Sequence, residues 1–154
     1  MEMSLYVFLR RVLVSFFLPF LLLTTLMPAS AQQALWMGLT AKVEMLINQG
    51  RYAEGAKVAQ EALKVAEDTF GPDHPVVGFS LVFLGQAYIG QGKYAEAEPL
   101  LKRALSIYEK ALRPDHPQVA TTLEKMAYLY KKTGRWDEAK RLEERAQAIR
   151  SRNQ

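Results

Sequence analysis

Cysteine is absent from the 154-residue chain. Its absence excludes disulfide bonds, a thiol nucleophile, thiolate metal sites and an N-terminal lipid on cysteine. The chain has only two histidines, His74 and His116, and each follows an aspartate. No Asn-x-Ser/Thr sequence occurs, so no N-linked glycan is expected.

Catalytic motifs are also absent. The chain contains no G-x-S-x-G, no H-E-x-x-H and no acidic calcium-binding loop. Gly85 and Gly90 have the spacing of a phosphate-binding loop, but Gln91 occupies the position of its lysine. That loop also follows a strand, whereas Gly85 falls within a predicted helix. The sequence therefore predicts a protein without enzymatic activity, cofactor or metal.

A strongly apolar run lies near the N-terminus. Residues 12–27 carry no charge, and Arg10 and Arg11 precede them. Alanines at positions 29 and 31 follow, where a signal peptidase reads small residues. The run is shorter than the roughly 20 residues of a membrane-spanning helix.

This layout predicts a secretory signal peptide over residues 1–31, cleaved after Ala31, and an exported protein that is periplasmic or secreted. The alternative is an uncleaved membrane anchor formed by residues 12–27. The mature chain, residues 32–154, would contain 18 basic and 15 acidic residues and is long enough for one domain with a buried core.

Basic residues gather near the C-terminus. Residues 131–152 contain eight bases and four acids. Such a segment can meet an anionic membrane surface or an acidic partner, but it more often forms a solvated face. Nucleic acid is not an expected partner of an exported protein, and a membrane is expected only through an uncleaved leader.

Internal repeats at an offset of 42 residues dominate the rest of the chain. Gly50, Gly92 and Gly134 are in register, and the run at 72–75, Pro-Asp-His-Pro, returns at 114–117. Eleven of 26 positions are identical between residues 50–75 and 92–117. Repeats of this length are typical of solenoids built from stacked helix pairs.

The central repeat carries a family pattern, G-R/K-Y-x-E-A-E-P-L-x-x-R-A-L-x-I, followed by the family's G-x-D-H-P linker with Arg113 in place of the glycine, whereas the first linker keeps Gly71. The matching residues are Gly92, Tyr94, Glu96, Ala97, Glu98, Pro99, Leu100, Arg103, Ala104, Leu105 and Ile107. Over residues 36–150 the chain thus resembles the tetratricopeptide repeats of the longer, kinesin-light-chain-like type. The resemblance implies an all-α right-handed solenoid of three helix pairs, with repeats at about 36–75, 76–117 and 118–150, and a protein-binding role.

Helical periodicity predicts six helices, at about residues 35–48, 52–70, 76–91, 94–112, 118–133 and 136–150. Gly50 is expected to close the first helix in a left-handed conformation. Asp73 is expected to cap the third helix, with Pro75 at its first position. The two histidines occupy equivalent linkers, which favours a role in helix caps and rigid turns.

Two further packing features are predicted. Gly85 should lie beneath a large side chain of its paired helix, and the equivalent residues Ala62, Ala104 and Ala146 should mark close helix approaches. The last helix differs, because Trp136, Ala139, Leu142, Ala146 and Ile149 form a single apolar stripe. The other faces of this helix are polar, as the end of a solenoid requires.

The inner face of the solenoid, formed by the first helix of each pair, is the candidate binding surface. Thr121 belongs to it, and its predicted partner-binding residues are Phe79, Val82, Phe83, Gln86, Ile89, Glu124, Lys125, Tyr128, Lys131 and Lys132. The family often has paired asparagines here, whereas this chain has Val82-Phe83 and Glu124-Lys125. We therefore expect an apolar patch beside a charged one, with Phe79, Val82, Phe83 and Ile89 not needed for folding.

These observations predict an exported, non-enzymatic interaction module that binds a protein or peptide on its concave helical face. The alternative is a self-associating structural subunit of an envelope assembly, in which a second copy covers the apolar inner face. For Phe83 a further alternative is packing between neighbouring helices as part of the core.

Overall fold

The computed structural model describes residues 27–153, and their secondary structure consists of helices and short connections. The helices are α2 (Ala29–Asn48), α3 (Tyr52–Phe70), α4 (Pro75–Gly90), α5 (Tyr94–Ala111), α6 (Pro117–Lys132) and α7 (Trp136–Arg152). Each lies where the periodicity predicts a helix, although α2 begins six residues earlier than expected. All but Met27 of the predicted apolar run at 12–27 lies outside the described residues.

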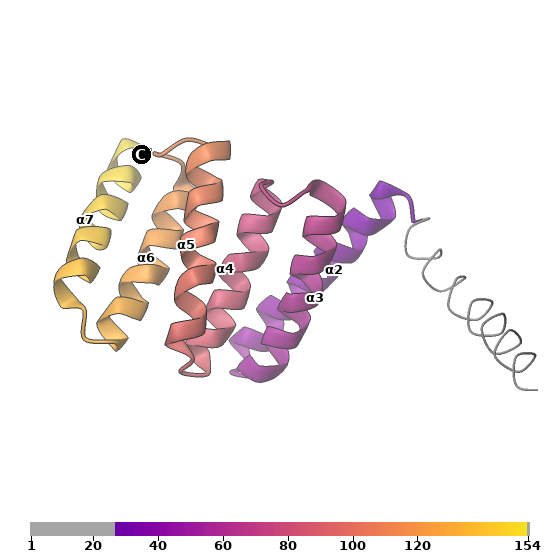
Figure 1. The fold of residues 1–154 in the computed structure, drawn as a ribbon, viewed down its shortest axis with the longest axis horizontal. Helices are drawn as coiled ribbons and strands as arrows, with labels where there is room; N and C mark the ends of the chain where they lie inside the picture. The colour runs from indigo at the N-terminus through magenta and orange to yellow at the C-terminus, as the bar shows by residue number, and fades with distance from the viewer. Residues whose placement is uncertain (1–26, 154) are drawn as a thin grey trace, which may run out of the picture. The chain divides into compact units, whose positions relative to one another are not determined.

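The chain divides into two compact units, residues 1–32 and 33–154, and the repeats lie in the second. Within that unit the helices form three pairs, α2 with α3, α4 with α5, and α6 with α7 (Figure 1). Successive pairs stack, because α3 packs against α4 and α5 packs against α6. The predicted all-α helical-repeat solenoid is confirmed.

A left-handed glycine separates the two helices of each pair. Gly50, Gly92 and Gly134 have φ angles of 72°, 75° and 78°, which confirms the expectation for Gly50. The residue after each glycine donates its N–H to a carbonyl of the preceding helix. These bonds are Arg51 to Leu46 at 2.9 Å, Lys93 to Tyr88 at 2.9 Å and Arg135 to Tyr130 at 2.8 Å.

Histidines cap the first helices of the second and third repeats. The Nδ1 atom of His74 accepts a hydrogen bond from the Val76 N–H at 3.2 Å, and His116 accepts one from Gln118 at 3.2 Å. The prediction that Asp73 caps this helix is wrong. Pro75 is the first helical residue, as expected, so the capping position falls on the histidine that directly precedes it.

Small residues allow the paired helices to approach closely. A Cβ at Gly85 would lie 3.0 Å from a Leu101 methyl carbon, which confirms that a large side chain of α5 covers this glycine. The equivalent alanines Ala62, Ala104 and Ala146 are all buried. The repeat register read from the sequence is therefore the packing register of the solenoid.

Fewer residues of the last helix are buried than its apolar stripe predicts. Ala139, Ala146 and Ile149 are buried, but Trp136 is 64% exposed, so its expected place in the apolar stripe is wrong. The equivalent Tyr52 packs over Gly90 of the next repeat. No repeat follows α7 in the described residues, which leaves the indole uncovered.

Candidate functional site: a groove on the inner face

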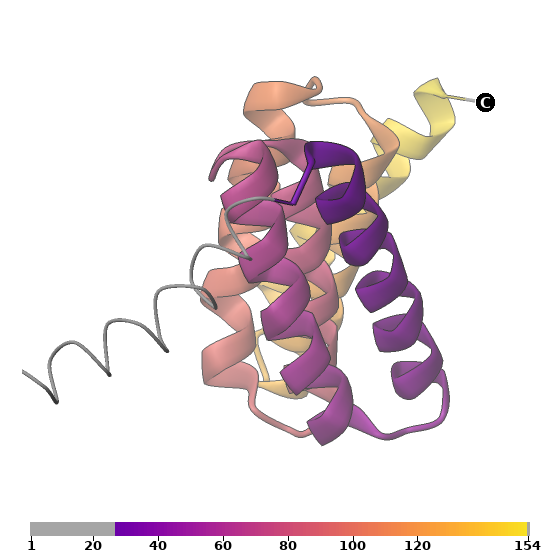
Figure 2. The same cartoon turned by 90° about the vertical axis from the view of Figure 1, so that its right-hand side faces the viewer.

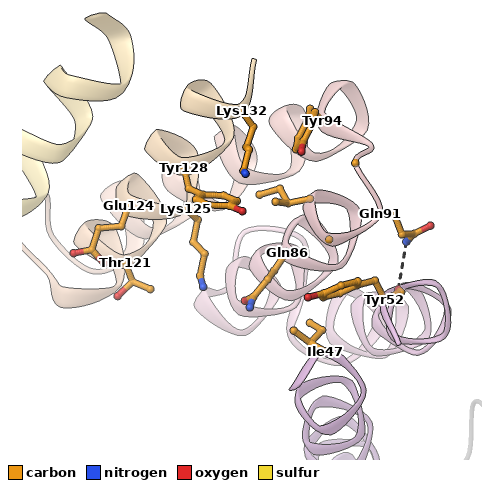
Figure 3. A pocket seen from close by; sticks show the side chains of 13 residues that line it. Ile47, Tyr52, Gln86, Gln91, Tyr94, Thr121, Glu124, Lys125, Tyr128 and Lys132 are labelled. Atoms are coloured by element: carbon orange, nitrogen blue, oxygen red, sulfur yellow. Dashed lines mark hydrogen bonds between the residues drawn. The ribbon is translucent and has the colours of Figure 1, made fainter. Parts of the chain in front are cut away.

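A groove of about 750 Å³ lies along the first helices of the second and third pairs. Its walls come from α4 and α6, and its rim comes from the ends of neighbouring helices (Figure 3). The lining residues are Ile47, Tyr52, Gln86, Ile89, Gly90, Gln91, Gly92, Tyr94, Thr121, Glu124, Lys125, Tyr128 and Lys132. The name groove below refers to these residues.

Helical spacing explains why α6 supplies so much of the wall. Thr121, Lys125, Tyr128 and Lys132 recur at three- and four-residue steps, which places them on one face of the helix. Six of the ten predicted partner-binding residues line this groove. They are Gln86, Ile89, Glu124, Lys125, Tyr128 and Lys132.

The apolar residues of α4 lie elsewhere. Phe83 packs against the buried cluster formed by α2, α3 and α4, and Val82 packs against the two clusters of the later helices. The Phe79 ring makes edge-to-face contacts with Phe83 at 4.8 Å and Trp36 at 5.8 Å. The expectation that these three residues are not needed for folding is wrong, because Phe79 and Phe83 contact the preceding repeat and Val82 packs against the clusters of the later helices. The core role of Phe83 is the alternative that the packing supports.

Lys131 also points away from the groove. Its Nζ lies 2.5 Å from an oxygen of Glu143 on α7. It therefore takes part in the contact within the last helix pair and is not among the residues that line the groove.

Ion pairing sets the charge of the groove. Arg150 donates two hydrogen bonds to the Glu124 carboxylate, at 2.5 and 2.7 Å. These bonds lower the pKa of Glu124, with burial acting in the opposite direction. Lys125 and Lys132 form no ion pair within residues 27–153, and Lys132 lies 5.3 Å from the centre of the Tyr128 ring. The groove is therefore positively charged.

The sequence prediction missed the rim of the groove. Tyr52 and Tyr94 begin the second helices of their pairs, and the left-handed glycine turns bring them beside the first helices. The Gln91 side chain donates a hydrogen bond to the Tyr52 carbonyl at 3.3 Å (Figure 3). The aromatic residue two positions after each glycine was the available signal, but its position on the inner rim depends on the turn.

The basic C-terminal segment is largely engaged in ion pairs. Five of its eight cations contact carboxylates, and three of these pairs join α7 to earlier helices. Arg145 contacts Glu109 of α5 at 2.6 Å, and Arg150 contacts Glu124 of α6. These charges mainly hold the last helix in place.

The described residues offer neither a metal site nor a membrane span. In that part of the chain no group of three histidines, cysteines or acids could hold an ion. Across residues 27–153 no helix combines the length and the hydropathy needed to cross a bilayer.

The repeat register, the glycine turns and the helix pairs have a match among protein families. The tetratricopeptide repeat profile covers residues 37–110 and 81–152, well over half of the chain. The chain belongs to the tetratricopeptide repeat family. Proteins of this family generally act as non-catalytic interaction modules. A comparison with curated proteins found no significant match.

Solved tetratricopeptide repeat structures share the fold. BtubC (BKLC) from P. vanneervenii superposes with a TM-score of 0.72 and 21% identity, over 79% of this chain and 48% of that one. A putative kinesin light chain from Podosopora anserina gives 0.70 and 23%, over 84% and 59%. The TPR domain of Arabidopsis FLU gives 0.69 and 16%, over 80% and 99%. This chain thus spans about half the length of BtubC.

Proposed function

We propose that this tetratricopeptide repeat protein is an exported, non-enzymatic adaptor that binds an acidic segment of a partner protein in its groove. The observation that carries the proposal is the pairing pattern within the groove. Its one carboxylate, that of Glu124, is neutralised by Arg150, whereas Lys125 and Lys132 have no such partner. Complementary charge raises both the rate and the specificity of association.

The spacing of the two lysines suggests the form of the ligand. Seven residues of α-helix separate them, which corresponds to about 10 Å along the helix axis. A peptide in the polyproline II conformation spans about that distance in three residues, and its side chains at i and i+3 lie on the same side. Tyr128 lies between them and is 51% exposed, so it offers a ring to an apolar or aromatic side chain. The fitting ligand is an extended segment with acidic residues three apart and an apolar residue between them.

Fluorescence anisotropy tests this proposal. The probe is a fluorescein-labelled peptide that has glutamates three residues apart around a tyrosine, and the reference peptide has glutamine in place of glutamate. We expect the glutamate peptide alone to bind, with an affinity that falls as salt screens the charges. The double variant Lys125→Glu, Lys132→Glu should weaken binding by about tenfold or more.

Lys57→Glu is the matched control, because Lys57 is exposed on α3 and does not line the groove. Equal binding of the two peptides, or an equal loss in the control, would contradict the proposal. Circular dichroism of each variant separates loss of binding from loss of fold.

Export rests on the leader, with its basic pair, its uncharged run at residues 12–27 and its small residues at 29 and 31. Cleavage after Ala31 would remove only three residues of α2 and none that is buried. We expect the protein expressed from the full sequence in a bacterium to appear in the envelope fraction with the mass of residues 32–154. A full-length mass in the membrane fraction would instead support the anchor.

A further inference from the structure

The side of α2 that faces away from the core is apolar and uncovered in residues 33–153. Leu35, Met37 and Met45 are 44%, 57% and 49% exposed. Ala34, Gly38 and Ala41 lie among them on the same side and are also exposed. We call these six residues the α2 face; the helix places five of them opposite the buried Val43, and Leu35 lies at the edge of the face, on the side of the buried Leu46.

The repeat register shows what kind of surface this is. Leu35 is equivalent to Val77 and Val119, and Met45 is equivalent to Ala87 and Leu129. All four equivalents are at most 1% exposed, because the preceding helix pair covers them. Leu35 and Met45 therefore belong to the docking face of a repeat, and no preceding repeat lies on it within residues 33–153. Figure 2 shows α2 beside α3 at this end of the stack.

The other end of the stack, formed by α7, is polar. Glu143 occupies the position on α7 that the buried Leu101 occupies on α5. It pairs with Lys131, and Arg150 pairs with Glu124 nearby. This polar end does not suit an apolar docking face, so a head-to-tail chain of copies is disfavoured.

We propose that the α2 face binds the same face of a second copy, with the two α2 helices antiparallel about a two-fold axis. Closed two-fold dimers are the commonest symmetric assemblies, and they bury one surface patch against itself. Placing the axis between residues 39 and 40 sets Gly38 opposite Ala41 of the second copy. The same register sets Met45 opposite Ala34, so a large side chain meets a small one on either side of the axis.

Charge is compatible with this pairing. Lys42 and Glu44 are the only charged residues of α2, and helical geometry places them on opposite edges of the α2 face. In the antiparallel arrangement each edge of the α2 face meets the same edge of the second copy. Equivalent residues of the two copies are displaced from each other along the helix axis. Lys42 then lies nearest Leu35 of the other copy and Glu44 lies nearest Met37, so like charges do not face each other. The α2 face shares no residue with the groove, and the proposal stands independently of peptide binding.

Molar mass measured over a concentration series tests the dimer, with protein purified from cells that express the full sequence. We expect a reversible dimer whose dissociation constant rises by about tenfold or more in Gly38→Glu. No atom lies within 4 Å of a Cβ at Gly38, so the monomer accommodates this side chain and its helicity should be unchanged. Trp136→Glu is the matched control, an exposed apolar residue at the other end, and should leave the dimer intact.

The absence of native cysteine allows a direct test of the register. A mixture of the single variants Ala34→Cys and Met45→Cys should oxidise to a mixed disulfide dimer, whereas each variant alone should stay uncrosslinked. In a dimer of one variant the two cysteines would be about 16 Å apart along the helix axis, which is too far for a disulfide bond. A chain that is monomeric at every concentration, a dimer unaffected by Gly38→Glu, or crosslinking of Ala34→Cys alone overturns the proposal.

Discussion

Tyr108 shows how closely single residues are fitted in this solenoid. Its side chain is almost completely buried, and a Cβ at Gly78 would lie 2.9 Å from its ring. No described residue offers its hydroxyl a hydrogen-bond partner, and burial raises the pKa of the phenol. The ring therefore stabilises the core, while the hydroxyl carries an uncompensated desolvation cost.

Tyr108→Phe should consequently leave the free energy of unfolding unchanged or raise it by about 1 kcal/mol, because it removes an unpaired buried hydroxyl. Urea unfolding followed by circular dichroism measures the change. Gly78→Ala is the contrasting variant and should destabilise the fold, since the added methyl group meets the ring. A Tyr108→Phe protein that loses 2 kcal/mol or more would show that the hydroxyl has a partner.

Ala104 tests the close approach of helices at the residue scale. It is fully buried in the cluster that also contains Ala66, Val77 and Tyr108. Ala104→Leu should overpack this cluster and lower the free energy of unfolding by about 1–3 kcal/mol. Ala146→Leu is the comparison and should cost less, because no repeat covers α7 in the described residues. Equal melting temperatures for Ala104→Leu and wild type would contradict the packing register.

At the scale of elements, one carboxylate joins the second and third repeats. Glu98 of α5 accepts hydrogen bonds from the Tyr130 hydroxyl of α6 at 3.0 Å and from Arg135 at 2.9 Å. Lys102 contacts it at 2.7 Å from its own helix. Burial opposes ionisation of Glu98, but these three contacts outweigh it and lower its pKa to about 2.

The sign of the pH dependence follows from that shift. Because the folded pKa lies below the value of about 4.3 expected in the unfolded chain, Glu98 stabilises the fold above that pH. The contribution is lost as the pH falls toward 2. Glu98→Gln should cost about 1–2 kcal/mol at pH 7, and this difference should shrink as the pH falls from 5 to 2. Urea unfolding at several pH values measures it, and a difference independent of pH would contradict this role.

At the scale of the whole molecule, the three buried clusters are continuous. Leu63 and Leu100 contact both the cluster around Val43 in the first repeat and the central cluster around Leu81. Val82 and Leu105 contact both the central cluster and the cluster around Leu101 and Met126. Neighbouring repeats that share side chains should unfold together rather than one at a time.

Two tryptophans allow cooperativity to be measured, because Trp36 lies in α2 and Trp136 begins α7. The variants Trp136→Phe and Trp36→Phe each leave one reporter, at opposite ends of the repeats. Within each variant, the fluorescence midpoint in urea should coincide with that of circular dichroism. A fluorescence transition displaced from the helical one would show that an end unfolds separately.

The sequence alone determined the fold, because helical periodicity recurs at a fixed spacing together with glycine and the Pro-Asp-His-Pro run, as in stacked helix pairs. It also determined most of the groove, since residues on one face of a helix follow from periodicity. The periodicity could not show that Phe79 and Phe83 contact the preceding pair, that Val82 packs against the later helices, or that Lys131 pairs with Glu143. Those outcomes depend on which neighbouring helix lies against each face. Within residues 27–153 the same dependence leaves Trp136 and the outer side of α2 exposed, because burial in a solenoid is decided by the adjacent repeat.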